Sequence, residues 1–245
     1  MAKLASAPRR IGGNLLPECN EAITRVVFMG PSLSYHELGS IPFDVSMLPP
    51  IRRGDVDQVS QRFPNVKTIG IVDGEFFQSF AVSPKEILRS MDRGKRFLGS
   101  SSMGALRATE LTIYGMVGIG NIYRMFFAGE IDADDEVAMT YDPVTLTPTS
   151  EPLANMRIAL ERSCEKGELS HSVMEKAIGI AQDLYYPDRT YGAMLACART
   201  KLSDAEFRDL KDACQTPSNA KREDAWHLLS FMEIVSDPYR KQVHQ

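Results

Sequence analysis

A run of small residues near the middle of the chain has the composition of a catalytic or anion-binding turn. Two apolar residues precede the small polar run 99–102, and a helical pattern begins near Met103. A strand that turns directly into a helix places the turn at the carboxyl edge of an open sheet, where α/β folds build their sites. Ser102 would then lie at a helix N-terminus, where the N–H groups of Met103 and Gly104 face an anion or a developing oxyanion.

A nucleophilic serine needs a base, and the sequence offers a lysine. Ser102 begins the S-x-G half of the G-x-S-x-G turn of serine hydrolases, although serine replaces the first glycine. The four histidines lack a suitable spacing, which favours Lys85 as the base. Lys85 follows Ser83 and Pro84, which begin a helix whose cap Glu86 is expected to complete. A cation in a first turn opposes the helix dipole, so Lys85 either serves an anion or a proton transfer, or is an ordinary solvated lysine.

Three further charged residues are candidates for the same site. Asp73 follows a predicted buried strand at residues 66–72, which places its carboxylate at the same sheet edge. The alternative is a simple Asp-Gly turn. Arg107 and Glu110 are three residues apart on a predicted helix, a spacing typical of an ion pair. Alternatively, Arg107 holds an acidic ligand over the turn.

Composition excludes several classes of function. The net charge of −4 argues against broad binding of nucleic acid, which needs a basic surface. The four cysteines form no C-x-x-C pair, and we expect reduced thiols in a cytoplasmic protein. We expect neither a membrane span nor a signal peptide. The acidic run at residues 132–136 either binds a divalent cation or forms a solvated loop, and the missing EF-hand pattern favours the loop.

The order of the predicted elements gives the fold class. Strands and helices alternate over residues 23–148, which predicts an α/β domain of three layers around a largely parallel sheet. Residues 1–22 lack periodicity and are expected to form a loose arm. Residues 149–245 carry apolar stripes with helical spacing and predict a small helical domain. A short helix after Pro31 and a strand at residues 137–141 are also expected.

Several motifs in order along the chain resemble the TfuA-like family. The resemblance extends over roughly residues 25–141, and the ordered series is far more specific than any one of its short motifs. The matching segments are Phe28-Met29-Gly30-Pro31-Ser32-Leu33, Pro49-Pro50-Ile51-Arg52-Arg53-Gly54-Asp55, Ile69-Gly70-Ile71-Val72-Asp73-Gly74, residues 81–88, residues 101–108, residues 115–118 and residues 134–138.

The resemblance implies a partner of YcaO enzymes, which activate a backbone amide with ATP. A TfuA-like protein is thought to supply the sulfur of a thioamide by hydrolysing the thiocarboxylated tail of a small ubiquitin-like sulfur carrier. No cofactor or metal is expected. That chemistry needs a nucleophile or activated water, oxyanion donors and a base, for which Ser102, Lys85 and Asp73 are the candidates. The expected substrate-binding residues are Arg53, Asp55, Ser101, Met103, Gly104, Arg107 and Glu110.

Two other hypotheses remain open at this point. A non-catalytic adaptor would dock the YcaO enzyme and deliver carrier or peptide, in which case the serines only cap a helix and bind an anion. A serine esterase of the α/β-hydrolase type would need His227 or His244 as its histidine, and it lacks the first glycine of the motif.

Overall fold

The chain divides into two compact units in the computed structural model, which describes residues 22–33, 37, 45–76 and 80–235. The first unit comprises the described residues up to Glu130 together with those from Lys221 onward, and the second comprises Ile131–Ala220. These ranges differ from the expected domains 23–148 and 149–245. The last helix belongs with the sheet, because its apolar face packs there.

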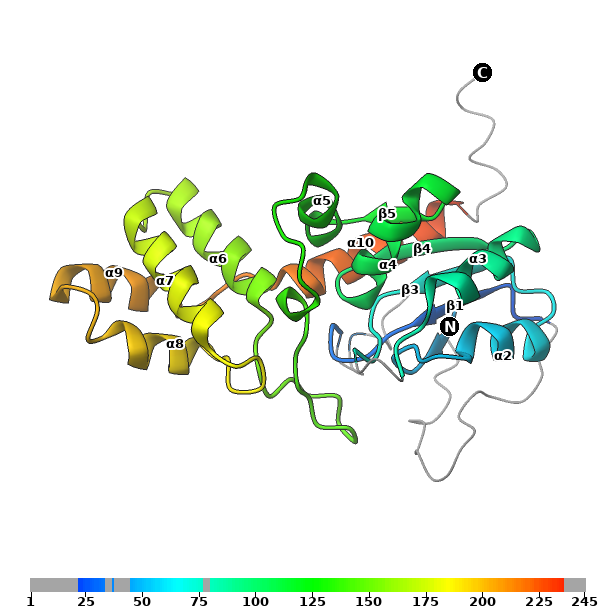
Figure 1. Cartoon of the computed structure of the whole chain (residues 1–245), viewed down its shortest axis with the longest axis horizontal. Coiled ribbons are helices and arrows are strands. Elements are labelled where there is room, and N and C mark those ends of the chain that lie inside the picture. Colours follow the sequence, from blue (N-terminus) through cyan, green and yellow to red (C-terminus); the bar gives the residue numbers. More distant parts are fainter. Residues whose placement is uncertain (1–21, 34–36, 38–44, 77–79, 236–245) are drawn as a thin grey trace, which may run out of the picture. The chain divides into compact units, whose positions relative to one another are not determined.

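The first unit is built on a parallel sheet of five strands (Figure 1). The strand order is β2-β1-β3-β4-β5, and every neighbouring pair is parallel, as the sequence predicts. The chain leaves β1 toward β2 on one side and returns to β3 on the other, so the topological switch point lies between β1 and β3. The strands are β1 Arg25–Phe28, β2 Ser46–Leu48, β3 Thr68–Ile71, β4 Arg96–Ser100 and β5 Val117–Ile119.

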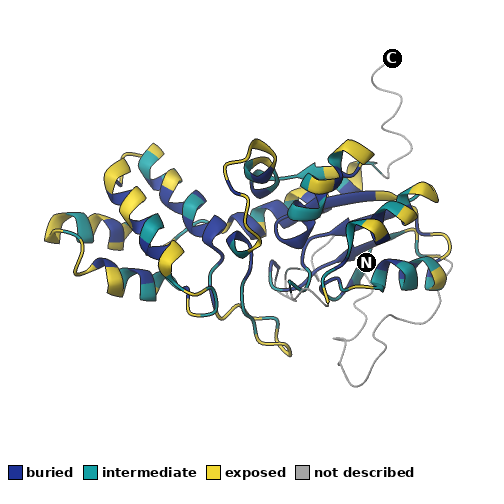
Figure 2. Ribbon diagram, in the orientation of Figure 1, coloured by how far each residue is buried: buried dark blue, intermediate teal, exposed yellow. Residues whose placement is uncertain are grey.

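Helices cover both faces of this sheet and confirm the three-layer prediction. Val26 and Phe28 of β1 point into one core, whereas Val27 between them points into the other, the alternation expected of a strand buried on both faces. The first core also contains residues of α2, α3 and α4, and the second contains residues of α10 (Figure 2). These helices are α2 Asp55–Arg62, α3 Pro84–Asp92, α4 Met103–Leu111 and α10 Ala220–Val235; α4 continues into the 3-10 turn η1 Thr112–Tyr114, and α5 spans Asn121–Ala128.

Two glycines allow helices to approach the sheet closely. A Cβ atom on Gly104 would lie 1.8 Å from the carbonyl oxygen of Ile71, so α4 begins directly against β3. A Cβ atom on Gly70 would lie 2.9 Å from the Met232 sulfur and 3.0 Å from Leu228, both on α10. Small residues at these positions therefore set the heights of α4 and α10 above the strands.

The second unit is helical, as the apolar stripes predict. Its helices are α6 Leu153–Glu165, α7 His171–Asp183, α8 Tyr191–Ala198 and α9 Asp204–Ala213. Their buried faces meet in one core. Ser203 and Glu206 form the capping box that begins α9. Among the described residues, none of the helices combines the length and apolar character that a membrane crossing requires.

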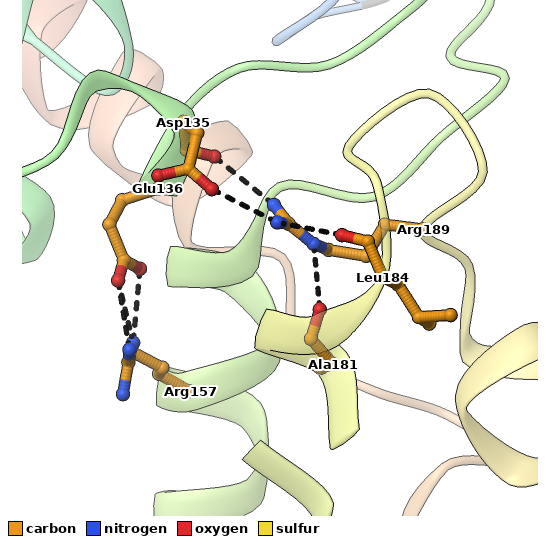
Figure 3. Close-up of polar contacts among 6 residues, drawn as sticks. All are labelled: Asp135, Glu136, Arg157, Ala181, Leu184 and Arg189. Carbon is orange, nitrogen blue, oxygen red and sulfur yellow. Dashed lines mark hydrogen bonds and ion pairs between the residues drawn. The ribbon is translucent and has the colours of Figure 1, made fainter. Parts of the chain in front are cut away.

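Two ion pairs tie the acidic loop of the second unit to its helices (Figure 3). The Arg189 side chain is 1% exposed, and its guanidinium donates to the Asp135 carboxylate at 3.1 Å as well as to carbonyl groups of Asp135, Ala181 and Leu184. Arg157 binds both carboxylate oxygens of Glu136. This part of the acidic run therefore fastens the loop within the unit.

Two expected elements are absent or lie partly outside the described residues. Residues 31–33 form a turn, and the rest of the short helix expected after Pro31 lies outside the described residues. The strand expected at residues 137–141 is wrong. The 3-10 turn η2 Asp134–Glu136 leads into a loop that pairs only through an isolated bridge between Tyr141 and Pro148, and proline has no N–H with which to extend a ladder.

Candidate functional site

The central serines lie on a strained turn between β4 and α4. Strand β4 ends at Ser100, and α4 begins at Met103. Ser101 has a φ of 67°, and the Ser102 N–H donates to the Ser100 carbonyl at 2.8 Å, which together define a γ-turn with positive φ. A non-glycine residue in this conformation costs about 1–3 kcal/mol and is found mainly where the surroundings hold it in place. The strand-to-helix turn is thus present as the sequence predicts, and the structure adds that it is strained at Ser101.

A lysine from the last helix reaches the second of these serines. The Lys221 Nζ lies 3.0 Å from the Ser102 Oγ, and both residues are 2% exposed. Lys221 stands in the first turn of α10, 119 residues after Ser102 in the sequence. The Ser102 side chain makes no capping hydrogen bond to the first turn of α4, so its hydroxyl is directed to the lysine instead.

Asp73 is a buried anchor at the same edge of the sheet. One carboxylate oxygen accepts the N–H groups of Gly30 at 2.9 Å and Ser32 at 3.0 Å, and the other accepts the Ser32 hydroxyl at 2.7 Å. That second oxygen is also 3.8 Å from the Lys221 Nζ. A simple Asp-Gly turn would not need these contacts with distant residues. They favour the alternative in which the Asp73 carboxylate belongs to a site at the sheet edge.

Opposing influences act on the Lys221 amine. Burial and the positive end of the α10 dipole both disfavour the ammonium, whereas the Asp73 carboxylate favours it. Such opposing influences are typical of lysines that exchange a proton during a reaction.

A serine pair completes the site. The Ser32 and Ser101 hydroxyl oxygens are 2.9 Å apart, and both side chains are buried. We use the term serine–lysine cluster for the five residues Ser32, Asp73, Ser101, Ser102 and Lys221. Four of these residues lie on the segments that follow β1, β3 and β4. These strands are neighbours, since the register pairs Phe28 with Ile71 and Ile71 with Gly99. The cluster therefore lies at the topological switch point, where parallel sheets usually bind their ligands.

The expected pair of oxyanion donors at the helix N-terminus is reduced to one. The Gly104 N–H donates to the Val72 carbonyl at 3.2 Å, because α4 lies so close to β3. The Met103 N–H donates to no backbone acceptor among the described residues. Met103 is thus the remaining amide of that turn that could face a developing oxyanion.

Lys85 is not part of this cluster. It is exposed on the first turn of α3, which Ser83 caps by accepting the Glu86 N–H, as predicted. Arg107 and Glu110 form the expected ion pair at 2.7 Å, and the Arg107 Nε donates to the Val82 carbonyl. Arg107 is thereby engaged by its own helix and by the segment that precedes α3.

The segment that carries Arg53 and Asp55 forms a second group of charges. Glu86 was expected to cap its own helix, but its carboxylate instead accepts the N–H groups of Gly54 and Val56, each at 3.0 Å, at the start of α2. Burial raises the pKa of Asp55 to about 6, and the nearby Glu86 carboxylate adds to that rise. Arg53 is exposed, and its N–H donates to the Phe80 carbonyl.

Two members of the cluster, Ser32 and Lys221, were not predicted as site residues from the sequence. The signal for Ser32 was its position just after a strand that ends at Gly30, in the same sheet as Asp73. The signal for Lys221 was a cation in the first turn of a helix, the same argument that singled out Lys85. Nothing local distinguishes the two lysines, because only the fold brings Lys221 to Ser102.

The arrangement can support nucleophilic or general-base chemistry. An uncharged amine 3.0 Å from a serine hydroxyl can take its proton, and a nearby carboxylate can stabilise the ammonium that results. Neither step requires a histidine or a metal ion.

Comparison with known proteins supports one family. No curated protein matches the chain. The family model of TfuA-like proteins matches residues 73–190, just under half of the chain, and this range contains Asp73, Ser101 and Ser102, whereas Ser32 and Lys221 lie outside it. Together with the ordered motifs and the α/β fold, this match supports the resemblance to the TfuA-like family.

Proposed function

We propose that the protein is a hydrolase that works with a YcaO enzyme and releases sulfide from the thiocarboxylated C-terminus of a ubiquitin-like sulfur carrier. The family is consistent with a role associated with YcaO enzymes. The observation that carries the hydrolase assignment is the hydrogen bond between Lys221 and Ser102 in a buried cluster with Asp73. A helix-capping serine would bond to its own helix, and Ser102 does not.

In the proposed first step, uncharged Lys221 takes the hydroxyl proton of Ser102 while the oxygen attacks the carbonyl carbon of the thiocarboxylate. The Met103 N–H faces the oxyanion that develops. The lysine ammonium then gives its proton to the sulfur as the carbon–sulfur bond breaks. Hydrosulfide leaves, and an ester of Ser102 remains.

In the second step, Lys221 takes a proton from water, and the resulting hydroxide attacks the ester carbonyl. Collapse of the tetrahedral intermediate returns the proton to Ser102 and releases the carrier as a carboxylic acid, which ionises to the carboxylate and gives its proton through solvent to the hydrosulfide. The net reaction converts a thiocarboxylate and water into a carboxylate and hydrogen sulfide, so no oxidant or other reactant is needed. Asp73 stabilises the ammonium form that Lys221 passes through in each step.

The test is sulfide release from a thiocarboxylated carrier by the protein alone. Ser102→Ala and Lys221→Met, each with a confirmed fold, should lose the activity, because they remove the nucleophile and the base. Lys85→Ala tests which of the two lysines is the base. This variant should retain sulfide release, and a loss of sulfide release in it would return the role of base to Lys85. If the wild-type protein releases no sulfide alone but accelerates a YcaO reaction, the adaptor hypothesis replaces the hydrolase.

A further inference from the structure

We propose that Ser101 and Ser32 are positioning residues of the serine–lysine cluster, which hold the strained turn so that Ser102 faces Lys221. This inference rests on the proposed hydrolase function and deepens it. It starts from the backbone: Ser101 is one of two described non-glycine residues with positive φ, and the strain must be offset by contacts of its own.

The hydrogen atoms of the three polar groups fix the direction of these contacts. The Ser32 Oγ lies 2.7 Å from the Asp73 carboxylate, which can only accept, so Ser32 donates its single hydroxyl hydrogen there. The Ser32 oxygen must then accept at its other contact, and Ser101 is the donor across 2.9 Å. A directed chain therefore runs from Ser101 through Ser32 to Asp73.

This chain connects the turn to the charge that faces the lysine. The Asp73 oxygen that accepts from Ser32 is the one that lies 3.8 Å from the Lys221 Nζ. Ser101 precedes Ser102 directly, so holding the Ser101 side chain on the segment after β1 fixes the direction in which the Ser102 Oγ leaves the backbone. The same chain of hydrogen bonds thus holds the turn that carries Ser102 and the Asp73 carboxylate that faces Lys221.

The adjacent Ser100 provides a matched control. Its hydroxyl is fully buried, and within the described structure its oxygen has no hydrogen-bond partner. Ser100→Ala removes the same atom from the neighbouring residue without breaking a hydrogen bond. It reports the effect of losing a buried hydroxyl as such.

The experiment measures kcat and KM for sulfide release with four variants. Ser101→Ala removes the hydroxyl, and Ser101→Gly removes it while relieving the positive φ, because glycine adopts that conformation without strain. If the hydroxyl positions Ser102, both variants should lower kcat by about 10- to 100-fold with little change in KM. Ser32→Ala should do the same, and Ser100→Ala should stay within about twofold of the wild type.

Two results separate positioning from a purely structural role. The double variant Ser32→Ala/Ser101→Ala should be no slower than either single variant, because both act through the same chain. A wild-type kcat in Ser101→Gly, or additive losses of kcat in the double variant, would overturn the positioning role. Sulfide release by the wild-type protein would still support the proposed hydrolase function in either case. A wild-type protein that releases no sulfide would instead refute the proposed function, and with it this inference.

Discussion

Replacing Asp55 by asparagine should stabilise the protein at neutral pH. The half-buried Asp55 carboxyl lies near Glu86, and burial followed by the Glu86 charge raises its pKa from 3.8 to about 6, against the opposing effect of the hydrogen bond from the Arg52 N–H. Because the pKa is higher in the folded state, the folded protein keeps its proton between these values, and stability falls as the pH rises through that window. Above about pH 6 the whole cost is present.

The size of this effect follows from the rise in pKa. A rise from 3.8 to about 6 corresponds to about 3 kcal/mol, and screening by solvent at this half-buried position reduces that to about 1–2 kcal/mol. Asparagine removes the charge and keeps an oxygen that can accept the Arg52 N–H. The gain for Asp55→Asn should therefore be about 1–2 kcal/mol at pH 8 and close to zero at pH 4.

Urea unfolding of the wild type and Asp55→Asn at both pH values measures the difference. Asp57→Asn is a matched control in the same helix, because Asp57 forms a surface ion pair with Arg89. This variant should be less stable than the wild type by a few tenths of a kcal/mol at pH 8. An equal gain at pH 4 and pH 8, or a loss at pH 8, would refute the reasoning. If Asp55 also binds substrate, the same variant should gain stability while its KM rises.

Three further predictions concern packing and buried charge. Gly104→Ala should cost about 3 kcal/mol in thermal unfolding, because its Cβ meets a backbone oxygen at 1.8 Å, whereas Gly179→Ala, inside α7 with nothing within 4 Å, should gain about 0.5–1 kcal/mol. Asp224→Ala should cost about 3 kcal/mol and reduce sulfide release, because each carboxylate oxygen of the buried Asp224 accepts one N–H group of α5 at 2.8 Å, and Asp224 lies on α10 three residues after Lys221. A cost below about 1 kcal/mol would contradict the contribution of these two hydrogen bonds. Arg189→Met should destabilise the protein by about 3–5 kcal/mol in urea, and a change below 1 kcal/mol would show that its buried ion pair and carbonyl contacts are dispensable.

Helix caps, helix ends and the central turn could be predicted from the sequence, because each depends on residues that are close together in the chain. The cap at Ser83, the capping box at Ser203 and Glu206, and the helix from Asn121 to Ala128 all depend on neighbouring residues. The turn at residues 99–102 was predictable for the same reason. The strand expected at residues 137–141 failed because its apolar residues are buried without a neighbouring strand to pair with.

The candidate site was predictable only in part, because its charges come from distant segments. Asp73 and Ser102 follow strands of one sheet, so the sequence could place them at one edge. Lys221 arrives on a helix that follows the whole second unit, and no spacing rule connects it with Ser102. Glu86 illustrates the opposite case, in which a local pattern predicts a contact that the fold replaces. Its spacing from Ser83 fits a capping box, yet its carboxylate accepts N–H groups at the start of α2.

The most direct test of the account is the rate of sulfide release from a thiocarboxylated carrier by the isolated protein, compared with that of Lys221→Met and Ser102→Ala. We expect release by the wild type and a loss of at least about 1,000-fold in each variant, since nucleophile and base act as one unit and their separate effects do not add. Release that survives in Lys221→Met would contradict the assignment of the base. Survival in both variants would remove the serine–lysine cluster from the chemistry.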